Sequence, residues 1–169
     1  MSPAREQPSS AELERRRARQ RQALLEDGVR PEDLRVVVSP YRVCPIGAHS
    51  DHQHAPVLAT AIDAHSVLSF APAEDAEVRL RSENFEGALR FDLREPAAEP
   101  GSGWTRYPRA AAWALQGRLP GSPRGLVGCV GGPLPGGGLS SSASVLLAYL
   151  SALAHVNGIQ LAPRELVLL

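Results

Sequence analysis

Residues 131–157 read GGPLPGGGLSSSASVLLAYLSALAHVN, and this stretch is the most informative part of the sequence. It opens with glycines and prolines, passes through three serines and becomes a long apolar helix. Glycine lets a backbone come close to a ligand, and a helix N-terminus offers free N–H groups and the positive end of the helix dipole. Small hydroxyl side chains there can cap the helix, touch a phosphate or bind a metal ion. The stretch therefore predicts an anion site, and we expect a nucleotide triphosphate in it.

Length, charge and cysteine content set the broad class of the chain. Its 169 residues are enough for one domain with a hydrophobic core, and its 18 basic and 18 acidic residues give a net charge of zero. This balance offers no electrostatic attraction for nucleic acid or a membrane, and no apolar run approaches a membrane span. Cys44 and Cys129 lie far apart, so we expect reduced thiols in a cytoplasmic protein. We expect the protein to be a monomer that binds a small molecule.

The order of predicted elements is typical of an α+β domain with a mixed or antiparallel sheet. Residues 1–9 are expected to be disordered, residues 10–29 to form an N-terminal helix, and residues 30–169 to form the main domain. Hydrophobic patterning predicts strands over residues 34–39, 77–81, 88–93 and 126–130, short apolar segments over residues 57–62 and 67–71, and helices over residues 11–26, 104–119, 140–155 and 164–169. In the helix over residues 104–119, Trp104, Ala111, Trp113 and Leu115 are predicted to face inward.

The glycine-rich segment is neither of the two common phosphate loops. No GxxxxGK[ST] run occurs, the sequence has no lysine, and no acidic residue follows at the spacing of a dinucleotide-binding fingerprint. One alternative is a flexible linker that happens to precede a helix. The run from Leu134 to Ala143, LPGGGLSSSA, instead resembles the phosphate-binding motif of the GHMP small-molecule kinases, which include galactokinase and mevalonate kinase.

That resemblance implies ATP as co-substrate and Mg²⁺ as its metal ion. The loop of residues 132–143 would wrap the triphosphate, and Ser142 would be the magnesium ligand. The residues implied to contact ATP are Pro135, Gly136, Gly137, Gly138, Leu139, Ser140, Ser141 and Ser142.

A second motif lies upstream, where residues 39–53 read SPYRVCPIGAHSDHQ. It resembles the galactokinase signature, from which it departs at Cys44, Pro45, Ala48 and His52. One alternative is a buried turn with a solvated, histidine-rich edge. Another is a metal site made by His49, His52 and His54 with Asp51.

The two motifs together imply a fold and a set of roles. The fold is the GHMP-kinase N-terminal domain, which is similar to domain 2 of ribosomal protein S5 and has its helices packed on one face of a mixed sheet. Arg42 would be the catalytic residue that stabilises charge on the transferring phosphate. His49 and Asp51 would bind the sugar hydroxyls, with Ala48 and His52 beside them in the substrate site.

Ala48 bears on which sugar is bound. Galactokinases have glutamate there, and a sugar carboxylate roughly 4 Å from it would cost about 4 kcal/mol at an effective dielectric constant of about 20. Alanine removes that repulsion, and the run RLRSENFEG at residues 79–87 also looks more like galacturonokinase than galactokinase. We therefore expect phosphorylation of D-galacturonate at its anomeric hydroxyl, with galactose and arabinose as alternatives.

The apolar residues 166–169 begin a helix that the sequence does not continue, so we expect a fragment that lacks the C-terminal domain. The resemblance implies that the catalytic aspartate and an acidic magnesium ligand follow Leu169, and the chain alone is expected to be inactive. Two alternatives are a non-catalytic sugar sensor and the product of a pseudogene.

Overall fold

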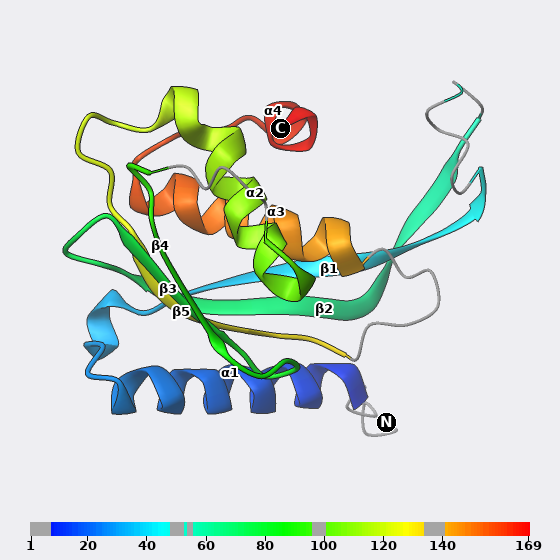
Figure 1. Cartoon of the computed structure of the whole chain (residues 1–169). Coiled ribbons are helices and arrows are strands. Elements are labelled where there is room, and N and C mark those ends of the chain that lie inside the picture. Colours follow the sequence, from blue (N-terminus) through cyan, green and yellow to red (C-terminus); the bar gives the residue numbers. More distant parts are fainter. Residues whose placement is uncertain (1–7, 48–52, 54–55, 96–100, 134–140) are drawn as a thin grey trace.

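The structure is a computed structural model, and it describes residues 8–47, 53, 56–95, 101–133 and 141–169 (Figure 1). The expected disorder over residues 1–7 lies outside the described residues, whereas Pro8 and Ser9 are helical and not disordered. In chain order the elements are α1 (Pro8–Glu26), the short helix η1 (Pro31–Asp33), β1 (Arg35–Ile46), β2 (Leu58–Pro72), β3 (Glu77–Ser82), β4 (Ala88–Asp92), η3 (Gly103–Thr105), α2 (Arg106–Leu115), η4 (Gln116–Arg118), β5 (Leu126–Gly131), α3 (Ser141–Val156) and α4 (Pro163–Leu168).

Five strands form one mixed sheet in the order β1-β2-β5-β3-β4. The β3–β5 pair is parallel, and the other neighbouring pairs are antiparallel, which confirms the predicted sheet type. The two apolar segments predicted over residues 57–62 and 67–71 belong to the single strand β2. Residues 63–66 between them are DAHS, which has no apolar alternation, but antiparallel pairing with β1 keeps this stretch extended.

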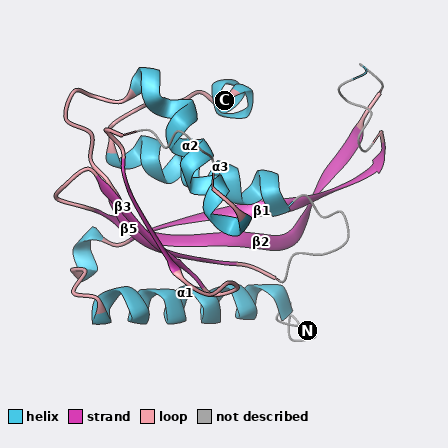
Figure 2. Cartoon of the chain, viewed as in Figure 1, coloured by secondary structure: helices cyan, strands magenta, loops and turns pink. Residues whose placement is uncertain are grey.

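The helices α2 and α3 of the main domain lie on one face of the sheet, as predicted, and α1, which was predicted as a separate N-terminal helix, covers the opposite face. This helix runs along one side against β2 and β5, while α2 and α3 lie on the other side (Figures 1 and 2). The sequence of α1 shows little apolar periodicity because a buried amide replaces part of the usual apolar stripe. Gln20 is 1% exposed, donates to the Val67 carbonyl oxygen at 3.2 Å and accepts the Ser69 hydroxyl at 2.8 Å.

The main core lies between the sheet and the α2–α3 layer. Its largest fully buried side chains on that side include Phe70, Leu115, Tyr149 and Leu153. Trp113 of α2 is 69% exposed, so its predicted inward orientation is wrong. Ala111 and Leu115 face the core. Trp113 lies two residues from each of them, and at 3.6 residues per turn this places it about 200° around the helix axis, on the opposite side.

The last helix packs against this core. Leu166 and Leu169 contact the core cluster, and the Arg118 guanidinium lies 3.2 Å from the Glu165 carboxylate. The Glu165 carboxylate also accepts the Ala162 N–H at 3.0 Å, which satisfies a free donor where α4 begins. The two leucines at this end of the described chain are therefore covered in part. Each helix in the described part of the chain is too short or too polar to cross a bilayer.

Candidate functional site

The structure brings the described ends of the two motifs together. The Ser144 hydroxyl, in the first turn of α3, donates a 2.8 Å hydrogen bond to the carbonyl oxygen of Ser39 in β1. The Tyr41 hydroxyl, two residues further along β1, donates to the carbonyl oxygen of Pro133 at 3.2 Å. Residues on both sides of the segment 134–140 are thus bonded to the strand that carries the second motif.

A cavity of about 510 Å³ opens beside these contacts, within the usual size range of small-ligand sites. Aromatic rings, small polar side chains and glycine backbone share its wall. The lining residues come from six segments of the chain, namely Tyr41; Ser66; Ser82, Asn84, Phe85 and Glu86; Gly103, Trp104, Arg106 and Tyr107; Val130, Gly131, Gly132 and Pro133; and Ser141, Ser142, Val145 and Tyr149.

The hydroxyls of Tyr107 and Ser142 lie 3.2 Å apart across the cavity wall. The Arg106 guanidinium donates to the Tyr107 hydroxyl oxygen at 2.7 Å and stacks 4.8 Å from the centre of the ring. The Ser142 hydrogen bond, with a further contribution from Arg106, lowers the pKa of Tyr107 below its ordinary value. Among the described lining residues, Arg106 is the one base and Glu86 the one acid, so Arg106 is available to attract a phosphate.

Two buried groups near the site, the Cys129 thiol and the Tyr149 hydroxyl, have raised pKa values and stay protonated at neutral pH. Burial raises the pKa of the Cys129 thiol to about 11, and burial also raises the pKa of Tyr149. Cys44 and Cys129 are both free thiols, which confirms that prediction. A thiol whose pKa is raised is a poor nucleophile at neutral pH, so Cys129 is a packing residue.

Three of the predicted site residues are described. Ser141 and Ser142 begin α3 and line the cavity. Arg42 is exposed in β1, does not line the cavity, and has no hydrogen-bond or ion-pair partner among the described residues. Adjacent strand residues point to opposite faces, so Tyr41 and not Arg42 approaches Pro133.

The other predicted site residues lie outside the described part of the chain. They are Ala48, His49, Asp51, His52, Pro135, Gly136, Gly137, Gly138, Leu139 and Ser140. The alternative metal site at His49, Asp51, His52 and His54 falls there too.

The described residues contain no group of three acidic, histidine or cysteine side chains that could hold a metal ion. Mg²⁺ prefers oxygen ligands and commonly takes several of them from water and substrate phosphates. The Ser142 hydroxyl on the cavity wall suits one such position. The described residues therefore fit a magnesium ion that is coordinated mainly by substrate phosphates better than a metal ion that is coordinated by protein side chains alone.

Sequence reasoning missed Tyr41, Asn84 and Tyr107 as site residues. Trp104, which was predicted to face inward, packs against the core cluster and also lines the cavity. The spacing of Trp104 and Tyr107 at i and i+3 was a usable signal, because it places two aromatic rings on one side of a helix start. Asn84 had no such signal. Its role depends on contacts with Gly132, which is 48 residues away in the sequence.

Comparison with known proteins places this geometry in a family. Residues 106–169 match the family model described as GHMP kinases N terminal domain. The chain is 40% identical over 152 residues to the galacturonokinase of Arabidopsis thaliana, covering 79% of this chain and 36% of that protein. It is also 40% identical over 134 residues to the galactokinase of Thermococcus kodakarensis, covering 79% of this chain and 37% of that protein.

A solved structure agrees with these sequence relatives. The Lactococcus lactis galactokinase complexed with galactose superposes with a TM-score of 0.73 at 30% identity, covering 81% of this chain and 36% of that one. The chain thus spans little more than a third of the length of these relatives. Motifs, fold and relatives agree, and the chain carries a GHMP kinase N-terminal domain.

Proposed function

We propose that this chain is the N-terminal part of an ATP-dependent sugar-1-kinase that phosphorylates the anomeric hydroxyl of D-galacturonate. The observation that carries the proposal is the cavity between the two motifs, with Tyr41 of the sugar motif and Ser141 and Ser142 of the phosphate motif in one wall. The similarity to galacturonokinase and galactokinase over 79% of the chain supports the reaction class.

The nucleotide would lie in this cavity with its phosphates toward the N-terminus of α3. That helix has 16 residues, so its dipole and free N–H groups favour an anion at this end. Arg106 adds a positive charge beside Ser142, and the rings of Trp104 and Tyr107 offer apolar surface for a flat base. When bound, Mg²⁺ would neutralise phosphate charge, with the Ser142 hydroxyl as one ligand.

The sugar would lie beyond Tyr41, toward the part of the signature that follows β1. In this proposal Arg42 stabilises charge on the transferring phosphate, and His49 and Asp51 bind the sugar hydroxyls. Ala48 leaves space and removes a negative charge where a glutamate would repel the carboxylate of D-galacturonate.

The catalytic base is proposed to lie beyond Leu169, because the chain spans little more than a third of its relatives' length and three described aspartates, Asp63, Asp75 and Asp92, are unsuited to the role. Asp75 pairs with the Arg79 guanidinium at 2.7 Å, and Asp92 pairs with Arg94. Asp63 lies 3.8 Å from the His65 ring. None of these aspartates lines the cavity.

Two measurements test the proposal. The 169-residue chain should bind Mg·ATP in a calorimetric titration, and the protein expressed with the downstream part of its reading frame should form a sugar 1-phosphate that phosphorus NMR detects. D-Galacturonate should be the better substrate, and Ala48→Glu should shift the preference toward galactose. Better turnover of galactose by the unmodified protein would refute the assignment of the sugar.

A further inference from the structure

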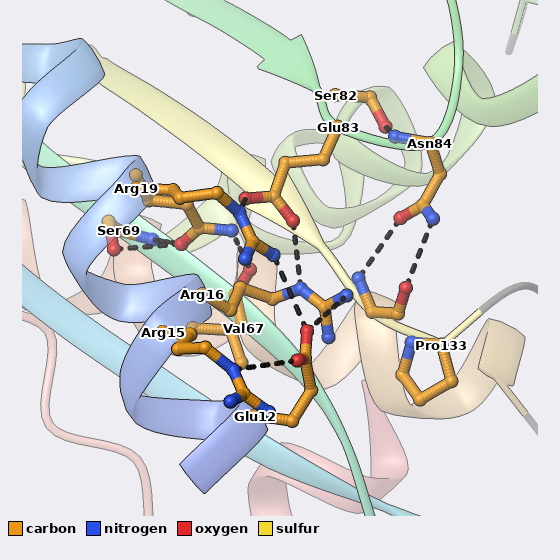
Figure 3. A network of polar contacts seen from close by, with 12 residues as sticks. Glu12, Arg15, Arg16, Arg19, Val67, Ser69, Ser82, Glu83, Asn84 and Pro133 are labelled. Atoms are coloured by element: carbon orange, nitrogen blue, oxygen red, sulfur yellow. Dashed lines mark hydrogen bonds and ion pairs between the residues drawn. The ribbon is translucent and has the colours of Figure 1, made fainter.

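Asn84 is joined to Gly132 by two hydrogen bonds (Figure 3). Its side-chain Nδ2 donates to the Gly132 carbonyl oxygen at 3.0 Å, and the Gly132 N–H donates to its Oδ1 at 3.0 Å. A primary amide has both a donor and an acceptor, so it can satisfy both backbone groups of one residue. Gly132 follows the last residue of β5, where the sheet no longer supplies these bonds.

A second side chain, that of Tyr41, also packs against the backbone at Gly132. A Cβ at this position would lie 2.6 Å from the Tyr41 hydroxyl oxygen, so that only glycine allows the approach. The same hydroxyl donates to the carbonyl oxygen of Pro133, the next residue. Gly132 and Pro133 are therefore fixed between β1 and the turn that follows β3, at the point where the chain enters residues 134–140.

The turn that carries Asn84 is itself anchored (Figure 3). The Asn84 N–H donates to the Ser82 hydroxyl at 3.2 Å, and the Glu83 N–H donates to the Val130 carbonyl oxygen at 2.8 Å. The Glu83 carboxylate accepts a 2.8 Å hydrogen bond from Arg16 of α1, and the two side chains are only 20% and 13% exposed. The turn is thus bonded to both β5 and α1.

We propose that Asn84 is a positioning residue for nucleotide binding, and that it acts by fixing the Gly132 backbone at the edge of the cavity. The inference rests on the proposed nucleotide site. Both polar groups of Gly132 are engaged by Asn84, so Gly132 contributes position and not a hydrogen bond to the ligand. Asn84 also lines the cavity, so a direct contact with the nucleoside is the competing explanation that the experiment must separate.

The chain contains a matched control at the other end of the same strand. Just before β5, the Arg124 N–H donates to Asn157 Oδ1 at 2.8 Å, and Asn157 Nδ2 donates back to the Arg124 carbonyl oxygen at 3.0 Å. Asn157 is not among the lining residues of the cavity. Removal of either asparagine amide breaks a pair of bonds to the backbone of one residue, and removal of the Asn157 amide also breaks its 2.9 Å bond to the Leu153 carbonyl oxygen. Only the pair made by Asn84 adjoins the proposed site.

The experiment compares Asn84→Ala and Asn157→Ala in the 169-residue chain. Calorimetry gives the Kd for Mg·ATP, and NMR titration gives the Kd for adenosine, which lacks phosphates. We expect Asn84→Ala to raise the Kd for Mg·ATP about tenfold, since two hydrogen bonds that preorganise the backbone are lost. Its Kd for adenosine, and both Kd values of Asn157→Ala, should change less than about twofold.

Amide hydrogen exchange of Gly132 without ligand supplies a second readout. Exchange should be faster in Asn84→Ala and unchanged in Asn157→Ala. Four results would overturn the inference: an unchanged Kd for Mg·ATP in Asn84→Ala, an equal loss for adenosine, the same loss in Asn157→Ala, or Gly132 exchange that stays slow without the Asn84 amide. If the unmodified chain binds neither ligand, the proposed function fails, and the inference fails with it.

Discussion

A Cβ on Gly132 would lie 2.6 Å from the hydroxyl oxygen of Tyr41 and 3.1 Å from the carbonyl oxygen of His65. Gly131, the preceding residue, is equally crowded, because a Cβ there would overlap the Glu83 carboxylate. Gly132 is therefore required by packing against protein atoms, and a side chain at Gly131 would displace the Glu83 carboxylate, although the sequence places both glycines at the start of a ligand loop.

Gly132→Ala should destabilise the fold by about 1–3 kcal/mol, because the new methyl group forces a backbone or side-chain shift. Urea unfolding would measure the loss. Gly117→Ala is the control, since nothing lies within 4 Å of its added Cβ. Tyr41→Phe removes the closest clash, so the double variant should lose less stability than the sum of the single variants. Simple additivity would show that Tyr41 is not the obstacle.

Ser144→Ala should lower the free energy of unfolding by about 1 kcal/mol relative to a matched serine substitution, because the hydrogen bond to the Ser39 carbonyl is lost. Ser151→Ala is the match, since it lies in the same helix and has the same gain in helix propensity. Urea unfolding of the two variants isolates the bond between α3 and β1. Equal stability of the two variants would mean that this bond adds nothing.

The sequence was a good guide wherever a pattern is local. The run of glycines, serines and apolar residues correctly predicted the helix α3, and hydrophobic patterning over residues 77–81 and 88–93 correctly predicted the strands β3 and β4, which pair antiparallel. Both patterns reflect contacts between near neighbours in the chain or periodic burial against one surface. The helix α1 was also expected, but its burial through Gln20 was not, because an amide does not register as a core residue.

The site was less predictable because long-range contacts make its wall. The phosphate motif correctly indicated Ser141 and Ser142, which line the cavity. Asn84 bonds the backbone of Gly132, which is 48 residues away in the sequence, and Tyr41 bonds the backbone of Pro133, which is 92 residues away. No pattern within one segment encodes such a pairing. Trp113 shows the opposite error, since an aromatic residue in an apolar helix is not always on its buried side.

Acid should remove a contribution to stability that comes from Asp92. Its carboxylate accepts the Arg94 side chain and the Arg94 N–H, and these bonds lower its pKa to about 2. The pKa in the unfolded chain is about 3.9, so the folded state favours the charged form. The contribution is therefore fully present above about pH 4 and is lost as the pH falls through the folded-state pKa of about 2.

The difference in unfolding free energy between the unmodified chain and Asp92→Asn should thus be constant near neutral pH and shrink between about pH 4 and pH 2. Arg94→Gln should remove the same pH dependence, because it removes the partner. A difference that persists unchanged at pH 2 would show that Asp92 acts through its shape and not its charge.

Ser142→Ala should raise the pKa of Tyr107 toward its ordinary value of about 10. The Ser142 hydroxyl is the larger cause of the lowered pKa, and the Arg106 guanidinium is the smaller one. Ultraviolet absorbance of the phenolate during a pH titration would follow the change, and Tyr107→Phe identifies the transition. Ser141→Ala is the control, since Ser141 also lines the cavity but no hydrogen bond joins it to Tyr107. If the pKa of Tyr107 does not change in Ser142→Ala, the two hydroxyls are not hydrogen-bonded in solution. The Ser142 hydroxyl could then bind a phosphate without first breaking a hydrogen bond to Tyr107.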